Sequence, residues 1–127
     1  GILQEIEATD GAPEKIKKAI VPDFENVYYP MKPVVPYAEV VHDRINLEIM
    51  RGCPHRCRFC HAVMFKNKLR FRSVETLLKQ AETVYNNTGY ESMALSSLSS
   101  GDHPHIAELM TRLNARFAPR NVNITLQ

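Results

Sequence analysis

The chain has 127 residues, of which 44% are apolar and 24% charged, and its formal net charge is +2. This length accommodates one domain with its own core, and the composition is that of an ordinary globular protein. No apolar run approaches the roughly 20 residues of a membrane-spanning helix, and the start GILQEIEATDG lacks the basic and apolar regions of a secretory signal. We therefore expect a cytoplasmic protein with no membrane partner.

The first segment, residues 1–43, is predicted to be an irregular lead-in arm. Prolines recur through it with tyrosines between them, and each proline fixes φ and removes a backbone donor. One short helix is expected in the arm, near Glu14 to Ala19. Residues 44–127 are predicted to form the folded domain.

The folded domain begins with a strand and a helix. The strand starts at Ile45 and shows an apolar period of two residues until Gly52 and Pro54 interrupt it. Ser73 is a candidate N-cap for a helix whose apolar residues recur at helical spacing. Gly89 is the expected end of that helix.

Two further strands and one helix complete the pattern. A second strand is expected over about 92–98, and a helix over 106–117 that Pro119 ends. A third strand, 122–126, again alternates apolar and polar residues. Strands that alternate with helices pair in parallel through right-handed crossovers, so the fold class is α/β. Because the strands alternate, their second face, which includes Glu48, should line a polar cavity, with ligands at the carboxyl ends of the strands.

The strand count predicts an incomplete barrel. Three strands cannot close a barrel, because closure needs about eight. The chain also begins with Gly and ends on an apolar strand. We therefore expect an excerpt of a longer protein, with the remainder of its parent chain as a partner and with an exposed third-strand edge that favours self-association.

Cys53, Cys57 and Cys60 form a CxxxCxxC pattern directly after the first strand. Three cysteines in one short segment are a poor disulfide framework and suit a metal site. Three thiolates can bind three corners of a 4Fe-4S cluster, which leaves its fourth iron open for a ligand. A saturated electron carrier would need a fourth cysteine, and inert core packing would not need three reactive thiols.

Zinc is the alternative metal for the same segment. Three cysteines with His55 or His61 would make a tetrahedral Cys3His site, and the basic residues over 51–72 could contact a nucleic acid backbone. The alternative function is therefore a zinc-stabilised nucleic-acid-binding module, although such charge runs are often solvated loops. In the iron–sulfur interpretation no histidine is assigned as a ligand among His42, His55, His61, His103 and His105.

The cysteine pattern, with an aromatic residue before its last cysteine and a strand before its first, resembles the radical S-adenosylmethionine (radical SAM) superfamily. The run from Tyr28 to Asp102, with YYPMKPVVPY, EVVHDR, RGCPHRCRFC and LSSLSSGD, is similar to an uncharacterised bacterial branch of that superfamily. The resemblance implies a partial (β/α) barrel of the radical SAM type, with this chain as its N-terminal half.

The resemblance also implies roles for the cysteine segment. Cys53, Cys57 and Cys60 would ligate a 4Fe-4S cluster, the open iron would chelate S-adenosylmethionine, and Phe59 would pack near the adenine. The reduced cluster would cleave the sulfonium to a 5′-deoxyadenosyl radical that abstracts hydrogen from an unknown substrate. An electron donor of the flavodoxin or ferredoxin type would be a partner. The fragment alone is expected to be inactive or nearly so.

The segment Ser99, Ser100, Gly101 and Asp102 occupies the place of the superfamily's glycine-rich turn, often Gly-Gly-Glu, which hydrogen-bonds the amino group of the bound methionine moiety. Here hydroxyls and one shorter carboxylate replace that turn. Asp102 could also cap the following helix. A methylthiotransferase acting on RNA or protein is another interpretation within the superfamily, although such enzymes carry an additional cluster domain.

Overall fold

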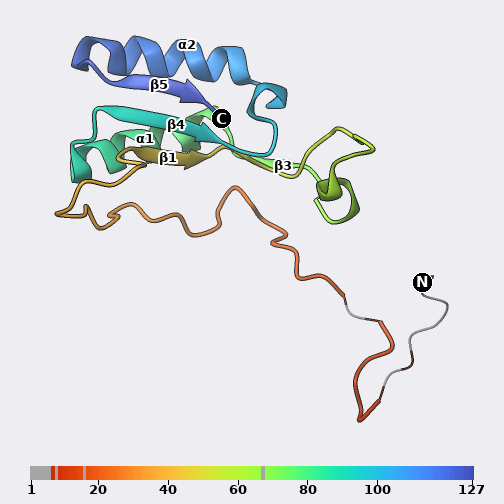
Figure 1. Ribbon diagram of the computed structural model, residues 1–127. Coiled ribbons are helices and arrows are strands. Elements are labelled where there is room, and N and C mark those ends of the chain that lie inside the picture. The colour runs from red at the N-terminus through yellow and green to blue at the C-terminus, as the bar shows by residue number, and fades with distance from the viewer. Residues whose placement is uncertain (1–6, 8, 16, 67) are drawn as a thin grey trace.

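The computed structural model describes residues 7, 9–15, 17–66 and 68–127. Its centre is a parallel sheet of β1 (Ile45–Glu48), β4 (Ser92–Ser96) and β5 (Asn123–Leu126), in the order β1-β4-β5. The helix α1 (Val74–Thr88) precedes β4, and α2 (Ile106–Phe117) connects β4 to β5 (Figure 1). The predicted α/β fold, part of a barrel with parallel strands and crossover helices, is confirmed.

The sheet has one apolar face and one mixed face. Two rungs of paired residues lie on the apolar face: Ile45, Met93 and Ile124, then Leu47, Leu95 and Leu126. The residues of β1 and β4 in these rungs are buried with residues of α1 and α2, and Ile124 packs against that core, whereas Leu126 at the end of β5 is 48% exposed. The intervening rungs lie on the opposite face: Asn46, Ala94 and Thr125, then Glu48 and Ser96. The predicted alternation is therefore present. Ala94 is nevertheless fully buried, because it is a small residue in the central strand.

The ends of α1 are those that the sequence predicts. The Ser73 hydroxyl accepts a hydrogen bond from the Thr76 backbone at 3.2 Å, and Gly89 ends the helix in a left-handed conformation with φ of 70°. Glu25 of the arm accepts hydrogen bonds from the Ser73 backbone N–H and from the hydroxyls of Ser73 and Thr76. Burial raises the pKa of Glu25, but these hydrogen bonds outweigh it and hold that pKa below 4.5. The arm therefore reinforces the start of α1.

The second helix packs beside the first and ends near the predicted proline. The short helical turn η3 (Ala118–Arg120) follows α2 and contains Pro119. The Glu82 carboxylate of α1 accepts hydrogen bonds from Arg116 at 2.6 Å and Arg120 at 2.9 Å, which ties the two helices together. The buried apolar residues of α2 are Leu109, Leu113 and Phe117.

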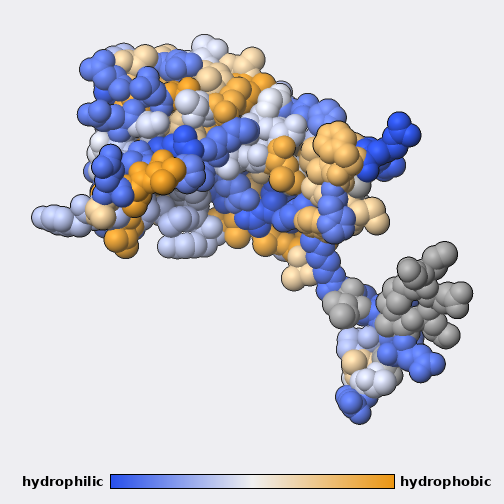
Figure 2. Space-filling view, in the orientation of Figure 1, coloured by the Kyte–Doolittle hydropathy of each residue, from blue (hydrophilic) through white to orange (hydrophobic). Residues whose placement is uncertain are grey.

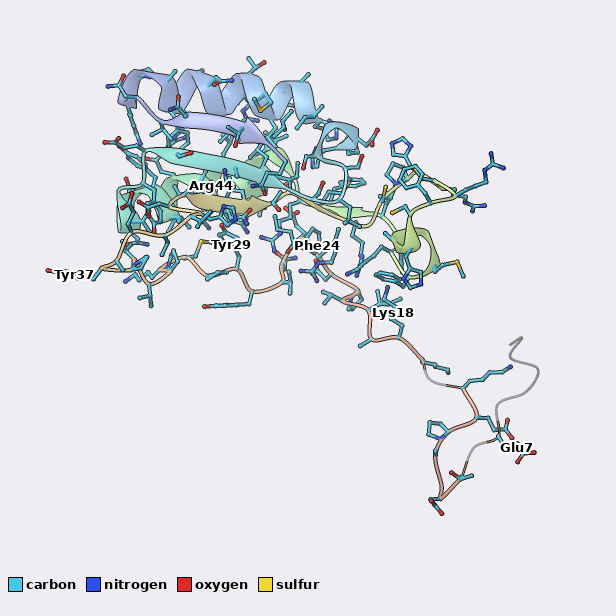
Figure 3. The ribbon with its side chains drawn as sticks, viewed as in Figure 1. Glu7, Lys18, Phe24, Tyr29, Tyr37 and Arg44 are labelled. Atoms are coloured by element: carbon cyan, nitrogen blue, oxygen red, sulfur yellow. The ribbon has the colours of Figure 1, made fainter. Side chains whose placement is uncertain are left out.

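The arm passes beside β1 and packs on it (Figures 1 and 3). Phe24 is only 3% exposed, and the guanidinium carbons of Arg51 and Arg72 each lie 4.8 Å from the centroid of its ring. Arg72, 1% exposed, also lies 5.3 Å from the ring centroid of Tyr29. The Tyr29 hydroxyl donates to the Asn46 carbonyl at 2.7 Å, and burial raises the pKa of Tyr29 to about 12. These cation–aromatic contacts make the arm part of the domain's packing.

The short helix predicted near Glu14 to Ala19 is not present at the described positions. Residue 16 lies outside the described residues, and residues 14, 15 and 17–19 are not helical and are exposed. A helix this short is unstable without a surface to pack against, because nucleation is costly. Among the described residues, no helix is long and apolar enough to cross a membrane.

A second, antiparallel ladder, which the sequence pattern did not indicate, joins β2 (Met50–Arg51) to β3 (Arg70–Phe71). The backbone N–H of Arg72 extends it by donating to the Ile49 carbonyl at 3.1 Å. The ladder joins the two ends of the segment 52–69, which contains the turn η1 (His61–Met64). That segment carries all three cysteines, so the ladder is the base of the candidate site.

Candidate metal and cofactor site

Two segments meet at the carboxyl edge of the parallel sheet. The cysteine loop, residues 53–60, follows β1 and β2, and the serine turn, residues 97–102, follows β4 and includes η2 (Ser100–Asp102). Figure 1 shows both segments at the end toward which the arrows of β1 and β4 point. In open parallel sheets this edge is where ligands bind.

Gly52 fixes the base of the cysteine loop. Its φ of 104° lies in a region that residues with a side chain rarely adopt. A Cβ atom at this position would lie 2.5 Å from the carbonyl oxygen of Lys68, so the close approach of the two chain segments also requires glycine. The next residue, Cys53, donates its backbone N–H to the Lys66 carbonyl at 3.0 Å. The first cysteine therefore starts from a well-defined anchor.

The three cysteines are free thiols on one loop. Cys53 and Cys57 are partly exposed, Cys60 is exposed, and the backbone N–H of Cys60 donates to the Cys57 carbonyl at 3.0 Å. Within the described part of the chain, no three His, Cys, Asp or Glu side chains are grouped as around a metal ion. The donor chemistry suits an iron–sulfur cluster, because thiolates are the ligands of these clusters and three free thiols lie on one short loop.

The serine turn is held from inside the fold. The Ser97 hydroxyl accepts from the Ser99 backbone at 3.1 Å and lies 3.0 Å from the Ser100 hydroxyl oxygen. Ser100 is buried, and its hydroxyl donates to the Leu95 carbonyl at 3.1 Å. The Ser100 hydroxyl is therefore used within the fold, while its predicted role in cofactor binding stays a prediction.

Asp102 joins the serine turn to the cysteine loop. Its Oδ2 atom accepts hydrogen bonds from the Ser99 hydroxyl and from His55 Nε2, the latter at 2.7 Å. The hydrogen bonds from Ser99 and His55 hold the pKa of Asp102 below 3.8, so Asp102 is ionised at neutral pH. The suggestion that Asp102 caps α2 is wrong: His105 occupies the N-cap position, without a side-chain cap bond.

Two other predicted cofactor residues lie in open surroundings. Phe59 is 93% exposed, between the second and third cysteines of the loop. Gly101 is also open, since a Cβ atom there would meet nothing within 4 Å. A ligand can approach both residues, and their predicted cofactor contacts stay predictions.

A pocket of about 390 Å³ lies beside the base of the cysteine loop, in the size range of small-molecule sites. Its wall includes Glu48 at the end of β1, so the polar cavity predicted at the carboxyl edge is present. The Glu48 carboxylate accepts two hydrogen bonds from Arg51 at 2.7 Å, which raise the pKa of Arg51. The lining residues are Glu48, Met50, Arg51, Gly52, Lys66, Ser96, Ser97 and Leu98.

The basic residues over 51–72 have different surroundings. Arg51 pairs with Glu48, and Arg70 donates to the Val21 carbonyl at 3.1 Å. Arg72 is buried, which lowers its pKa, and neither its Nε nor its Nη1 has a hydrogen-bond partner among the described residues. The exposed cations are Arg56, Arg58 and Lys68. Figure 2 shows hydrophilic and hydrophobic atoms side by side on the projecting segment that contains this stretch.

His103 connects the serine turn to the start of α1. It is 2% exposed, its Nε2 donates to the Arg72 carbonyl at 3.1 Å, and its Nδ1 accepts from the His105 backbone at 3.2 Å. This pairing requires the neutral imidazole with the proton on Nε2. Burial accordingly lowers the pKa of His103 below 6.5.

We expect acidification to destabilise the chain through His103. In the unfolded state the His103 side chain binds a proton near pH 6.5, whereas in the folded state burial lowers its pKa and keeps it neutral at that pH. Its stabilising contribution is therefore complete above that pH and is lost as the pH falls toward the lower pKa of the folded state. Urea unfolding at about pH 7.5 and about pH 5.5 measures this loss.

The matched variants for this prediction are His103→Gln and His42→Gln. His103→Gln should reduce the difference in the free energy of unfolding between about pH 7.5 and about pH 5.5. His42→Gln, at an exposed position, should keep that difference. Glu25 and Glu82 do not interfere, because their pKa values lie below 4.5. An unchanged pH difference in His103→Gln would contradict the assignment.

The chain is similar in sequence to known proteins. Residues 47–127 match the family model of the radical SAM superfamily. The chain is 35% identical over 98 residues to an uncharacterised protein of Methanocaldococcus jannaschii, a match covering 77% of this chain and 21% of that protein. It is 29% identical over 79 residues to the threonylcarbamoyladenosine tRNA methylthiotransferase MtaB of Bacillus subtilis, covering 58% of this chain and 17% of that enzyme. The chain thus spans about a fifth of the length of these relatives. No solved structure matches it.

Proposed function

Because the chain belongs to the radical SAM superfamily, we propose that it is an iron–sulfur protein that binds S-adenosylmethionine at the carboxyl edge of its sheet. Cys53, Cys57 and Cys60 would hold three irons of a 4Fe-4S cluster, with the fourth iron open for the amino and carboxylate groups of S-adenosylmethionine. The observation that carries the proposal is the meeting of the cysteine loop and the serine turn, which the contact between His55 and Asp102 joins.

When bound, the cluster would supply the reductive cleavage of S-adenosylmethionine to a 5′-deoxyadenosyl radical, which abstracts hydrogen from a substrate. The chain's own residues bind and orient the cofactor. Asp102 is ionised, which suits it to accept a hydrogen bond from the cofactor's amino group. Phe59, exposed within the loop, would stack on the adenine. Gly52 would fix the position of the cysteine loop relative to the sheet edge, through its close approach to the Lys68 backbone.

The pocket beside Gly52 would take the substrate or part of the cofactor. Glu48 and Arg51 neutralise each other there, and Lys66 lies in the same wall. In this chain alone the sheet has three strands, so water would reach the site freely. We therefore expect cofactor binding with little or no turnover until the rest of the parent chain covers the site.

The partners follow from the same arrangement. An electron donor of the flavodoxin or ferredoxin type would approach the exposed side of the cysteine loop. The exposed edge of β5, where Leu126 is partly exposed, would pair with further strands of the parent chain or with a second copy. Free thiols fit a reducing compartment such as the cytoplasm.

The alternative function is a zinc-stabilised nucleic-acid-binding module. Two observations favour it: the exposed cations Arg56, Arg58 and Lys68, and the pairing of His55 with a carboxylate, which often orients a zinc-bound histidine. A methylthiotransferase acting on RNA combines the two ideas, and one relative carries such a name. That reaction would require a further cluster domain beyond the residues described.

The identity of the bound metal decides between these functions. After anaerobic reconstitution with iron and sulfide, we expect a brown protein with about four irons and four sulfides per chain. Adding S-adenosylmethionine to the reduced protein should change the electron paramagnetic resonance spectrum of the cluster. A colourless protein that takes up one equivalent of zinc and no iron would support the zinc module and refute the proposal.

A further inference from the structure

The structure assigns a positioning role to His55: through Asp102, it fixes the placement of the cysteine loop relative to the serine turn. This inference rests on the proposed function and concerns how the two halves of that site are held together. Neither residue needs to touch iron for the inference to hold. The two side chains are 47 residues apart in the sequence and meet at 2.7 Å between His55 Nε2 and Asp102 Oδ2.

The direction of the hydrogen bond follows from the charge of Asp102. An ionised carboxylate can only accept, so His55 Nε2 carries the proton and donates. A hydrogen bond to an ionised partner is stronger than one between neutral groups. Both side chains are partly exposed, at 56% for His55 and 36% for Asp102, so solvent weakens the pair. We therefore expect loss of the His55–Asp102 hydrogen bond to change the position of the cysteine loop more than it lowers the free energy of unfolding.

Asp102 is the fixed member of the pair. Its backbone N–H donates to the Ser99 carbonyl at 3.0 Å, and its side chain accepts from the Ser99 hydroxyl. The following residue, His103, is buried and bound to the Arg72 carbonyl. The serine turn is thus attached to both the sheet and the start of α1.

The cysteine loop is the adjustable member. The backbone N–H of Cys53 donates to the Lys66 carbonyl, and among the described residues the backbone N–H of Cys60 donates only to Cys57 of the same loop. Between these two points, His55 makes the hydrogen bond that reaches the serine turn. Among the described residues, loss of this bond would leave the loop held by the ladder and by the backbone hydrogen bond of Cys53, so the loop would move more freely against Asp102.

The consequence for S-adenosylmethionine comes from its need to span both segments. Its amino acid group would bind at the cysteine loop while its amino group also reaches Asp102. Both side-chain hydrogen bonds that Asp102 accepts within the described part of the chain fall on Oδ2, which leaves Oδ1 to accept from the cofactor. A displacement of about 1 Å between two binding groups can cost a large part of the binding free energy that they provide together. His55 therefore sets cofactor affinity without contacting the cofactor.

The test compares three variants of the reconstituted chain. His55→Leu removes the donor, and His55→Gln keeps an N–H donor of similar reach. His61→Leu is the matched control, because His61 lies just beyond the loop and packs edge-on against Phe65. The measurements are iron and sulfide content, the dissociation constant for S-adenosylmethionine, and amide hydrogen exchange of residues 55–60 in the metal-free chain.

We expect His55→Leu to keep its iron and sulfide, to exchange loop amides several-fold faster, and to bind S-adenosylmethionine roughly 10-fold more weakly. His55→Gln should recover most of the affinity, and His61→Leu should match the wild type. Unchanged exchange and affinity in His55→Leu would overturn the inference and leave the proposed function intact. Loss of iron in His55→Leu would also overturn it, since His55 would then be a ligand. A wild-type chain that takes up no iron would instead refute the proposed function.

Discussion

Replacement of Cys57 by alanine should abolish the uptake of iron and sulfide by the chain. Cys57 is the middle member of the three-cysteine pattern, and two remaining thiolates cannot hold three corners of a cubane. We expect the iron content after anaerobic reconstitution to fall by at least about 10-fold. Cys53→Ala and Cys60→Ala should behave in the same way, because the proposal gives the three residues equal roles.

Phe59→Ala is the matched control within the same loop. Phe59 is exposed and would contact the adenine rather than an iron. This variant should therefore keep its iron and sulfide while binding S-adenosylmethionine several-fold more weakly. Circular dichroism of the metal-free proteins should show the same helix content in both variants, since the loop lies outside the buried core. Full iron loading of Cys57→Ala would contradict the assignment of the metal ligands.

Gly52→Ala should destabilise the chain by roughly 2–4 kcal/mol and also reduce cluster uptake by about 10-fold. The left-handed φ of 104° is strained for alanine, and the new Cβ would lie 2.5 Å from the carbonyl oxygen of Lys68. No side-chain rotation relieves a clash between a Cβ and the backbone, so the β2–β3 ladder has to open. Because Cys53 follows directly, the anchor of the cysteine loop moves with it. Urea unfolding and iron analysis measure the two effects.

Gly89→Ala and Gly101→Ala separate the two causes of this effect. Gly89 has φ of 70° but open space around it, so alanine should cost about 1 kcal/mol from backbone strain alone and leave iron uptake unchanged. Gly101 has open space and no left-handed φ, so alanine there should be nearly neutral for stability. Equal losses of stability in Gly52→Ala and Gly89→Ala would show that the close approach to Lys68 does not matter.

The elements that were predicted well are those with local causes. The serine before α1 and the glycine after it act on neighbouring backbone groups, so Ser73 and Gly89 identify the helix ends from the sequence. The strands also have a local cause, because successive side chains of a strand point to opposite faces of the sheet and the pattern is visible over neighbouring residues. The exception is the short helix near Glu14: the described residues of that segment, 14, 15 and 17–19, are exposed and so have no packing surface to support a helix.

The segment from Leu69 to Arg72 shows where local patterns mislead. Apolar Leu69 and Phe71 alternate with Arg70 and Arg72, which would place the apolar pair inside. In the structure Phe71 is 46% exposed, while Arg72 is buried against Phe24 and Tyr29 of the arm. The aromatic rings that accept the guanidinium lie more than forty residues away in the sequence. The alternation over residues 69–72 therefore cannot indicate that Arg72 is buried against these rings.

The amino-acid sequence by itself determined the spacing of Cys53, Cys57 and Cys60, the apolar periods of sheet and helices, and the helix ends. Each of these depends on residues within a few positions of one another. Only the tertiary structure decided that His55 meets Asp102, that Gly52 lies against Lys68, and that Arg72 is buried. The physical reason is that parallel strands bring distant loops to one edge of the sheet, and short-range contacts form there between residues that no local pattern relates.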